Sequence, residues 1–150
     1  MRMPGLSYTP DYFADDGALR DVFVVDAGIE QWDPVIDALR ASRWRLSISL
    51  DDEDITESAL AAALFDRLES GQASTARMEV CVESICFSTH FFAPSRLEFN
   101  FEPTAISGPD DFRHLRAFME LLASATRREV IMTMETSQHE GMPKLLSATP

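Results

Sequence analysis

RMEVCVESICFSTHFFAPSRLEFNFE, residues 77–102, alternates apolar and polar side chains along most of its length. A period of two is typical of β-strands that bury one face. The apolar members of the pattern are Met78, Val80, Val82, Ile85, Phe87, Phe91, Leu97, Phe99 and Phe101. We predict a three-stranded antiparallel meander, in which a turn at residues 83–84 sets Val82 opposite Ile85 and Cys81 opposite Cys86.

The opposite face of this meander is polar and mostly acidic; it carries Glu79, Ser88, His90, Glu98, Asn100 and Glu102. Four carboxylates also follow one another at residues 51–54. Complementary charge raises association rates and rejects wrong partners, so these groups predict a surface for a basic protein. The predicted partner-binding residues are Asp51, Asp52, Glu53, Asp54, Glu79, Glu98, Asn100 and Glu102. The plainer alternative is a solvated acidic surface without a partner.

The segments on either side of the meander predict three helices and three further strands. Apolar residues spaced by three and four predict helices at 29–41, 56–70 and 109–126. Strands are expected at 20–26, 44–50 and 129–135, and irregular chain at 1–18 and 137–150. The order strand, helix, strand, helix, three strands, helix, strand predicts a single α+β domain with a mostly antiparallel sheet and helices on one of its faces.

Several residues mark where the helices begin and end. Pro34 lies inside the first periodic segment, and because Pro is tolerated best in the first helical turn, Asp33 is an alternative N-cap there. Thr56 is expected to cap the second helix, which places the carboxylates of 51–54 near the positive end of its dipole. Gly71 should end that helix, and Pro109 should open the third.

Composition and net charge limit the classes of partner that the chain is expected to bind. The chain has 150 residues and a formal charge of −12, from 25 acidic and 13 basic residues. This charge repels nucleic acid and anionic membrane, so neither is an expected partner. No apolar run approaches the ~20 residues that span a bilayer, and the first residues do not resemble a signal peptide. With only two cysteines, the chain is predicted to be cytoplasmic, with reduced thiols.

Catalytic and metal-binding motifs are weak. Cys81, Cys86 and His90 are the candidate metal ligands, but a closed zinc site needs a fourth ligand and the spacing is not one of the usual zinc patterns. Neither cysteine lies at a helix N-terminus, where a thiol is activated. A cross-strand disulfide is geometrically conceivable, although the predicted compartment argues against it. We therefore expect two ordinary thiols, no metal, no cofactor and no enzyme.

Residues 16–24 read DGALRDVFV and precede a predicted helix that contains Trp32. This opening resembles that of small bacterial immunity proteins, which neutralise polymorphic or contact-dependent toxins. The resemblance covers about the first quarter of the chain. It implies a cytosolic, non-enzymatic inhibitor that binds a toxin domain tightly, and it assigns no contact residue.

Charge and resemblance together predict an immunity protein for a basic toxin domain, such as a nuclease. Two alternatives stay open. An acidic secretion chaperone would share the size and charge, and would cradle an unfolded segment of an effector. A small metal-binding protein or enzyme would be built on the cysteines and His90.

Overall fold

Eight strands form one sheet in the computed structural model, which describes residues 5–135 and 142–150. In space the strands follow the order β3-β2-β4-β5-β6-β1-β7-β8, and every neighbouring pair is antiparallel. The strands are β1 (Arg20–Val24), β2 (Arg45–Leu50), β3 (Glu53–Asp54), β4 (Ala76–Val82), β5 (Ile85–His90), β6 (Glu98–Phe101), β7 (Val130–Met134) and β8 (Leu146–Ala148). The helices are α1 (Ile29–Ala41), α2 (Ala61–Glu69) and α3 (Pro109–Thr126), with short 3-10 turns at Pro10–Phe13 and Pro103–Ala105.

The predicted α+β class is confirmed, and so is the meander. Cys81 pairs with Cys86 and Val82 with Ile85, as the alternation predicted. Two short strands were not expected. β3 lies within the carboxylate run, and β8 corrects the prediction that 137–150 is irregular; residues 137–141 of that prediction lie outside the described residues.

The strands at both edges of the sheet are short. β3 has two residues, Glu53 and Asp54, and β8 has three. On the far side of β8, the Ser147 N–H donates to the Gly5 carbonyl at 3.3 Å. The chain at Gly5 therefore runs beside β8, and further along Tyr8 and Phe13 pack against Phe112 of α3.

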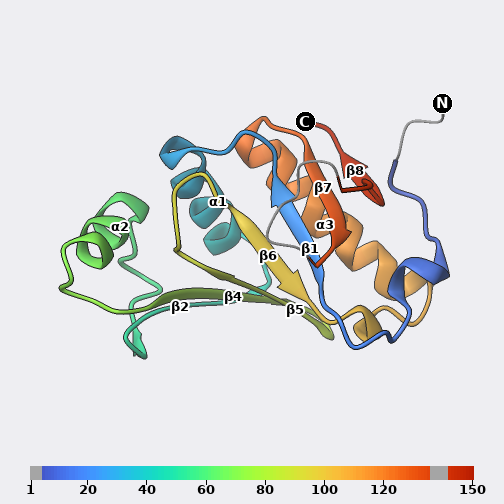
Figure 1. The fold of residues 1–150 in the computed structure, drawn as a ribbon, viewed down its shortest axis with the longest axis horizontal. Helices are drawn as coiled ribbons and strands as arrows, with labels where there is room; N and C mark the ends of the chain where they lie inside the picture. The colour runs from blue at the N-terminus through green and yellow to red at the C-terminus, as the bar shows by residue number, and fades with distance from the viewer. Residues whose placement is uncertain (1–4, 136–141) are drawn as a thin grey trace.

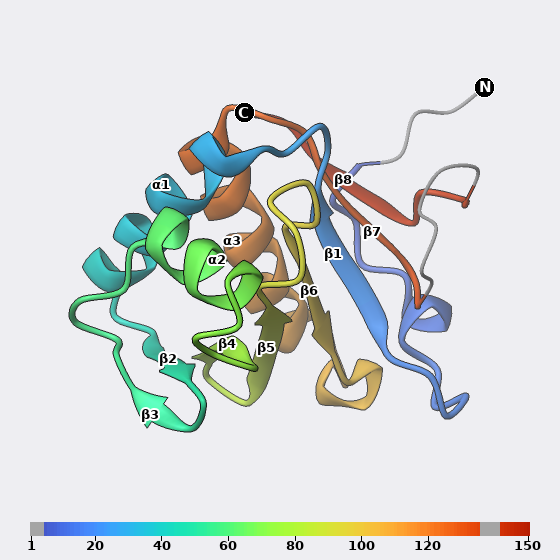
Figure 2. The same ribbon diagram turned by 60° about the vertical axis from the view of Figure 1, so that its left-hand side comes forward.

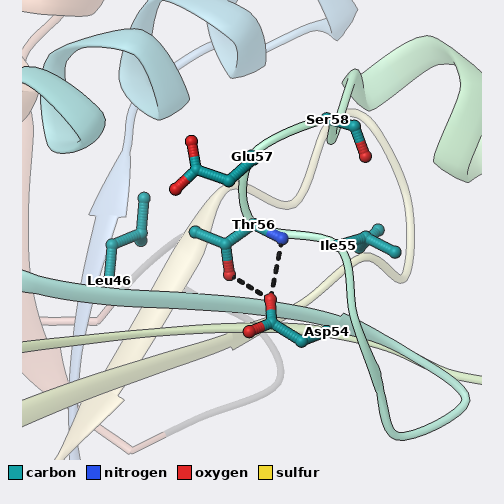
Figure 3. A pocket seen from close by; sticks show the side chains of 6 residues that line it. All are labelled: Leu46, Asp54, Ile55, Thr56, Glu57 and Ser58. Atoms are coloured by element: carbon teal, nitrogen blue, oxygen red, sulfur yellow. Dashed lines mark hydrogen bonds between the residues drawn. The ribbon is translucent and has the colours of Figure 1, made fainter.

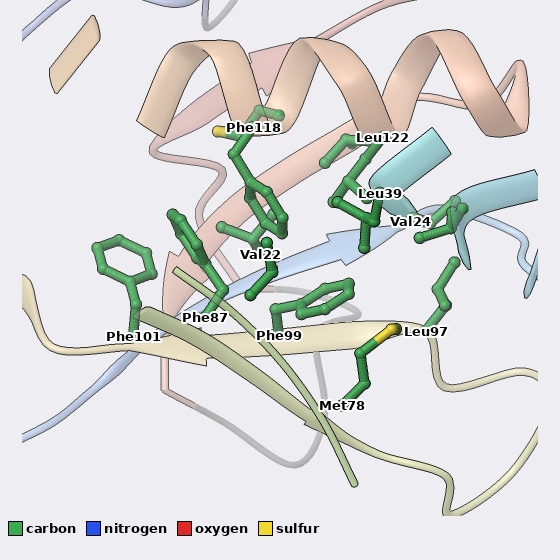
Figure 4. Packing of buried hydrophobic residues seen from close by; sticks show 14 of the residues in the cluster. Val22, Val24, Leu39, Met78, Phe87, Leu97, Phe99, Phe101, Phe118 and Leu122 are labelled. Atoms are coloured by element: carbon green, nitrogen blue, oxygen red, sulfur yellow. The ribbon is translucent and has the colours of Figure 1, made fainter. Parts of the chain in front are cut away.

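The two longer helices, α1 and α3, cover the same face of the sheet (Figures 1 and 2). The core lies between α3 and the meander, where Phe118 is the central ring (Figure 4). Phe118 stacks on Phe87 of β5 with ring centroids 3.9 Å apart, and it meets Phe99 of β6 edge-on at 5.1 Å. None of the described helices combines the length and the apolar character needed to cross a bilayer.

The predicted start of the second helix is wrong. α2 begins at Ala61, because Thr56 is engaged elsewhere: its hydroxyl donates to Asp54 at 2.6 Å and accepts the Ile48 N–H at 2.8 Å. The Ala61 N–H is capped from another helix, by the Asp33 carboxylate at 2.9 Å. The carboxylates of 51–54 are therefore not at the positive end of a helix dipole.

Of the two other predicted helix starts, the alternative start of α1 at Asp33 is wrong and that of α3 at Pro109 is confirmed. Asp33 is not the N-cap of α1, which begins at Ile29 after Gly28 and holds Pro34 inside the helix. The first turn is stabilised by Gln31, whose side chain accepts the Gly28 N–H at 2.7 Å. α3 begins at Pro109, as predicted.

Arg20 holds the N-terminal segment against the sheet. It is only 1 % exposed, and its guanidinium pairs with both oxygens of Asp16 at 3.2 Å. The same group also donates to backbone carbonyls, those of Tyr12, Ala14, Ala18 and Leu19. A buried cation is costly unless its donors are satisfied, so the 12–19 segment and Arg20 depend on each other.

Phe118→Ala should lower the free energy of unfolding by about 3–5 kcal/mol, because it removes the ring between α3 and the meander. Urea denaturation would measure the loss, with Phe118→Leu as a milder variant that keeps the fold. Phe92→Ala is the matched control, since Phe92 is 69 % exposed, and it should cost less than about 1 kcal/mol. Equal losses at the two positions would contradict this account of the core.

Arg20→Met should cost about 3 kcal/mol, because it leaves buried carbonyls without donors. Asp16→Asn keeps an acceptor for the guanidinium on a partly exposed side chain, and should cost clearly less than Arg20→Met. Urea denaturation gives both values, and limited proteolysis should cut the 12–19 segment faster in the Arg20 variant alone. Unchanged cleavage would show that Arg20 does not hold the segment.

Candidate functional site

The outer face of the sheet, the face away from α1 and α3, carries a row of polar side chains. The pairing registers align Ser47, Glu79, Ser88, Asn100 and Asp21 across five strands, β2, β4, β5, β6 and β1. The predicted polar face of the meander therefore exists, and it continues onto β2 and β1.

Two arginines make this face less acidic than the alternation predicted. Arg77 of β4 lies 2.9 Å from the Glu79 carboxylate and donates to the Ser88 hydroxyl at 2.9 Å. Arg96, in the loop before β6, pairs with Glu98 at 3.1 Å. Because each pair is close to neutral, the outer face alone is a poor attractor for a basic protein.

Exposure also differs across the outer face. The part of the outer face that lies on β1 is buried, and Asp21 there is 1 % exposed. Asn100 donates to the Asp21 carboxylate at 2.6 Å, so its amide serves the sheet itself. The Glu98 side chain is 15 % exposed. Among the predicted partner-binding residues of the meander, Glu79 and Glu102 are the more accessible.

The four carboxylates at 51–54 form the tip of a β-hairpin, which we call the acidic hairpin. Leu50 of β2 pairs with Glu53 of β3, so the turn between them has two residues. Both turn residues have positive φ, 48° at Asp51 and 68° at Asp52. This is the pattern of a type I′ turn, which suits the twist of the flanking strands and tolerates Asp.

Half of these carboxylates stabilise the hairpin. Asp51 accepts the N–H groups of Thr75 and Ser74, both at 2.9 Å, and these bonds hold the pKa of its carboxyl below the usual range. Asp54 accepts the hydroxyl and the N–H of Thr56, which lower its pKa in the same way. Both groups therefore act as structural anchors first, although they stay exposed and charged.

Beside the acidic hairpin lies an open depression of about 370 Å³ (Figure 3). It is lined by Leu46, Asp54, Ile55, Thr56, Glu57 and Ser58. Glu57 is exposed, as are Asp52 and Glu53. The depression is open and anionic, so its chemistry suits a cationic side chain of a protein partner.

A second feature, which the sequence reasoning missed, is the loop of residues 91–97, here called the aromatic loop. Phe92 is 69 % exposed, the highest value among the large apolar side chains that the structure describes. Its ring stacks on His90 with centroids 5.1 Å apart, and the Arg96 guanidinium lies 5.8 Å from its centre. The signal was present in the sequence, because only one of two successive Phe residues can face the core of a strand.

The aromatic loop is anchored from below. Phe91 is buried and stacks on Trp32 of α1, with ring centroids 4.8 Å apart. The Trp32 indole N–H donates to the Pro94 carbonyl at 2.8 Å. Phe92 therefore stands on a loop that is already fixed, so that little conformational entropy is lost when a partner covers it.

The acidic hairpin and the aromatic loop lie at the same end of the sheet (Figure 1). The Asp51 N–H donates to Thr75 just before β4, and the Phe91 N–H donates to Ala76 at the start of β4. The hairpin and the loop thus flank β4, with their strands about 10 Å apart at the usual strand spacing. We call these two features together the binding end.

The cysteines correct one prediction. Cys81 and Cys86 form a disulfide, so the expectation of reduced thiols is wrong in this structure. His90 lies four residues along β5 from Cys86, about 13 Å at strand spacing, so the three candidate metal ligands are not brought together. No group of three His, Cys, Asp or Glu side chains within residues 5–135 and 142–150 is arranged to hold a metal ion.

Acid should weaken the acidic hairpin. A carboxyl with a lowered folded-state pKa adds stability above its unfolded pKa of about 3.9, and this is lost as the pH falls through the folded value. Asp51→Asn should therefore show a smaller drop in urea midpoint between pH 6 and pH 3 than the unchanged protein. Asp52→Asn, at the neighbouring turn position with the same φ sign, is the control and should keep the full drop. Identical acid profiles for the Asp51 variant and the unchanged protein would remove Asp51 as an anchor.

Comparison with known proteins found no relative of this chain. The chain matches no protein-family model, no curated protein and no solved structure.

Proposed function

We propose that this protein is an immunity protein that binds and neutralises a basic bacterial toxin domain through its binding end. The observation that carries the proposal is the exposed, pre-positioned Phe92 at the same end of the sheet as a cluster of exposed carboxylates. An aromatic anchor enclosed by a polar rim is a common arrangement in protein interfaces.

The two features would act at different stages of binding. The carboxylates of Asp52, Glu53 and Glu57, within a chain of net charge −12, would steer a cationic partner during the diffusional approach. Phe92 would then enter an apolar pocket of the partner and slow dissociation. A toxin that acts on a polyanionic substrate carries such a cationic surface, and covering it would block the substrate.

An effector chaperone is less well supported by the surface. A chaperone that cradles an unfolded segment needs extended apolar grooves. Only three large apolar side chains are exposed in the described part of the chain: Ile29, Leu60 and Phe92. Phe92 is a single anchor and does not form a groove.

Co-expression with the protein encoded by the adjacent upstream reading frame tests the proposal. We expect that protein to inhibit growth when expressed alone, and this chain to restore growth and co-purify with it. Co-purification without any toxicity would favour the chaperone. A toxic neighbour that is neither rescued nor bound would refute immunity against that toxin.

Two variants of the binding end should weaken the complex in different ways. Phe92→Ala should raise the Kd at least about tenfold, mainly through faster dissociation. The double variant Asp52→Lys and Glu53→Lys should lower the association rate and flatten its dependence on salt. Surface plasmon resonance at two or more salt concentrations measures both effects.

Asp110→Lys is the charge control for this experiment; it changes the net charge by two units, against four in the double variant, so the effects are compared per unit of charge. Its side chain is 92 % exposed at the start of α3, which follows the C-terminal end of β6 and therefore lies away from the binding end. It should leave the association rate within about twofold. If Phe92→Ala and the double variant both bind normally, the interface lies elsewhere even though immunity stands.

A further inference from the structure

We propose that Cys81 and Cys86 form a reversible dithiol–disulfide site that exchanges with thiols of the glutathione or thioredoxin type. The site is independent of the proposed function, because it lies beside the 83–84 turn, at the other end of β4 and β5 from the binding end. These two residues are the only cysteines in the chain.

The hairpin brings the two sulfurs together without needing the bond. Cys81 and Cys86 are directly paired, with Cα atoms 4.1 Å apart, within a ladder of six residue pairs. The neighbouring Val80, Val82, Ile85 and Phe87 are buried on the opposite face, so the core fixes the register. Reduction therefore leaves the two thiols facing each other, ready to oxidise again.

The bond also adds little as a structural crosslink. It closes a ring of only six residues, and the stabilisation from restricting the unfolded chain rises with the length of the closed loop. A disulfide placed for stability would join segments that are distant in sequence. This one joins two residues across a tight turn that already pairs them.

Exposure and charge favour thiol attack at one sulfur. Cys86 is exposed on the outer face, whereas Cys81 is 7 % exposed. Arg45 of β2 is the direct cross-strand partner of Cys81 and is itself exposed. Its guanidinium would stabilise negative charge on the Cys81 sulfur, which makes Cys81 the better leaving group.

The exchange balances with two thiols. A thiolate attacks the Cys86 sulfur, the Cys81–Cys86 bond breaks, and Cys81 leaves as a thiolate that takes up a proton. The mixed disulfide at Cys86 is then resolved by a second thiolate, which attacks the sulfur of the bound thiol. Cys86 leaves as a thiolate and takes up a proton, and the two reductant thiols, together oxidised by two electrons, form a disulfide, between two molecules for glutathione and within one molecule for a dithiol.

The test equilibrates the full-length protein in buffers of reduced and oxidised dithiothreitol, and counts free thiols by maleimide gel shift. We expect zero or two thiols per chain, a transition that is reversible from both directions, and an unchanged circular dichroism spectrum. The thermal midpoint of the reduced protein should fall by less than about 10 °C. Thiols that appear only in denaturant, or a pair that never oxidises, would overturn the proposal.

Rate measurements test the part assigned to Arg45. Arg45→Gln should slow reduction of the native protein at least about twofold. Arg77→Gln is the matched control, because Arg77 is exposed on the same face of β4, four residues from Cys81, and should leave the rate unchanged. Equal rates in the two variants would overturn the role of Arg45.

Two arms distinguish the thiol source, one with reduced glutathione alone and one with a reduced thioredoxin-type protein. Reduction of the native protein in either arm supports the exchange and names its source. The double variant Cys81→Ser with Cys86→Ser separates redox chemistry from folding. It should match the reduced protein in thermal midpoint, and an unfolded double variant would show that the bond is structural.

Discussion

The stacking of Phe118 against Phe87 is the contact on which the rest of this structure depends. It joins α3 to the meander at a centroid distance of 3.9 Å, and Phe99 closes the contact from the next strand. Because side chains alternate between the two faces of a strand, burying these rings on one face places their sequence neighbours on the opposite face. Burial on one side thus determines which polar groups line the other, including the cross-strand pair Glu79 and Ser88.

Features set by local chemistry could be predicted from the sequence, and features set by distant contacts could not. The meander register follows from its alternation and its two-residue turn, and α3 begins at Pro109 because Pro suits the first helical turn. The start of α2 depends on Asp33, 28 residues earlier in the chain, which caps Ala61. β8 likewise forms by pairing with β7, and three residues are too few for their alternation to predict a strand.

At the candidate site, the run of carboxylates in the sequence indicated the acidic hairpin, but the alternation overestimated the acidity of the outer sheet face. Arg77 and Arg96 lie beside the carboxylates they neutralise, and Asn100 bonds to Asp21 from a strand far away in sequence. Phe91 was assigned to the buried face, but Phe92 was not recognised as exposed, although strand geometry leaves room inside for only one of the two adjacent rings. The pairing of the cysteines was correctly predicted from geometry, whereas the argument from cellular compartment led to the wrong oxidation state.

The two short sheet edges bear on how this chain behaves at high concentration. An exposed strand edge is a template for open-ended stacking of copies into fibrils. Here one edge is only Glu53 and Asp54, whose charges repel an identical strand, and the other is occupied by the Gly5 carbonyl that accepts from Ser147. Because its edges offer the backbone of other copies little to pair with, the chain should resist edge-to-edge aggregation when it accumulates to high concentration.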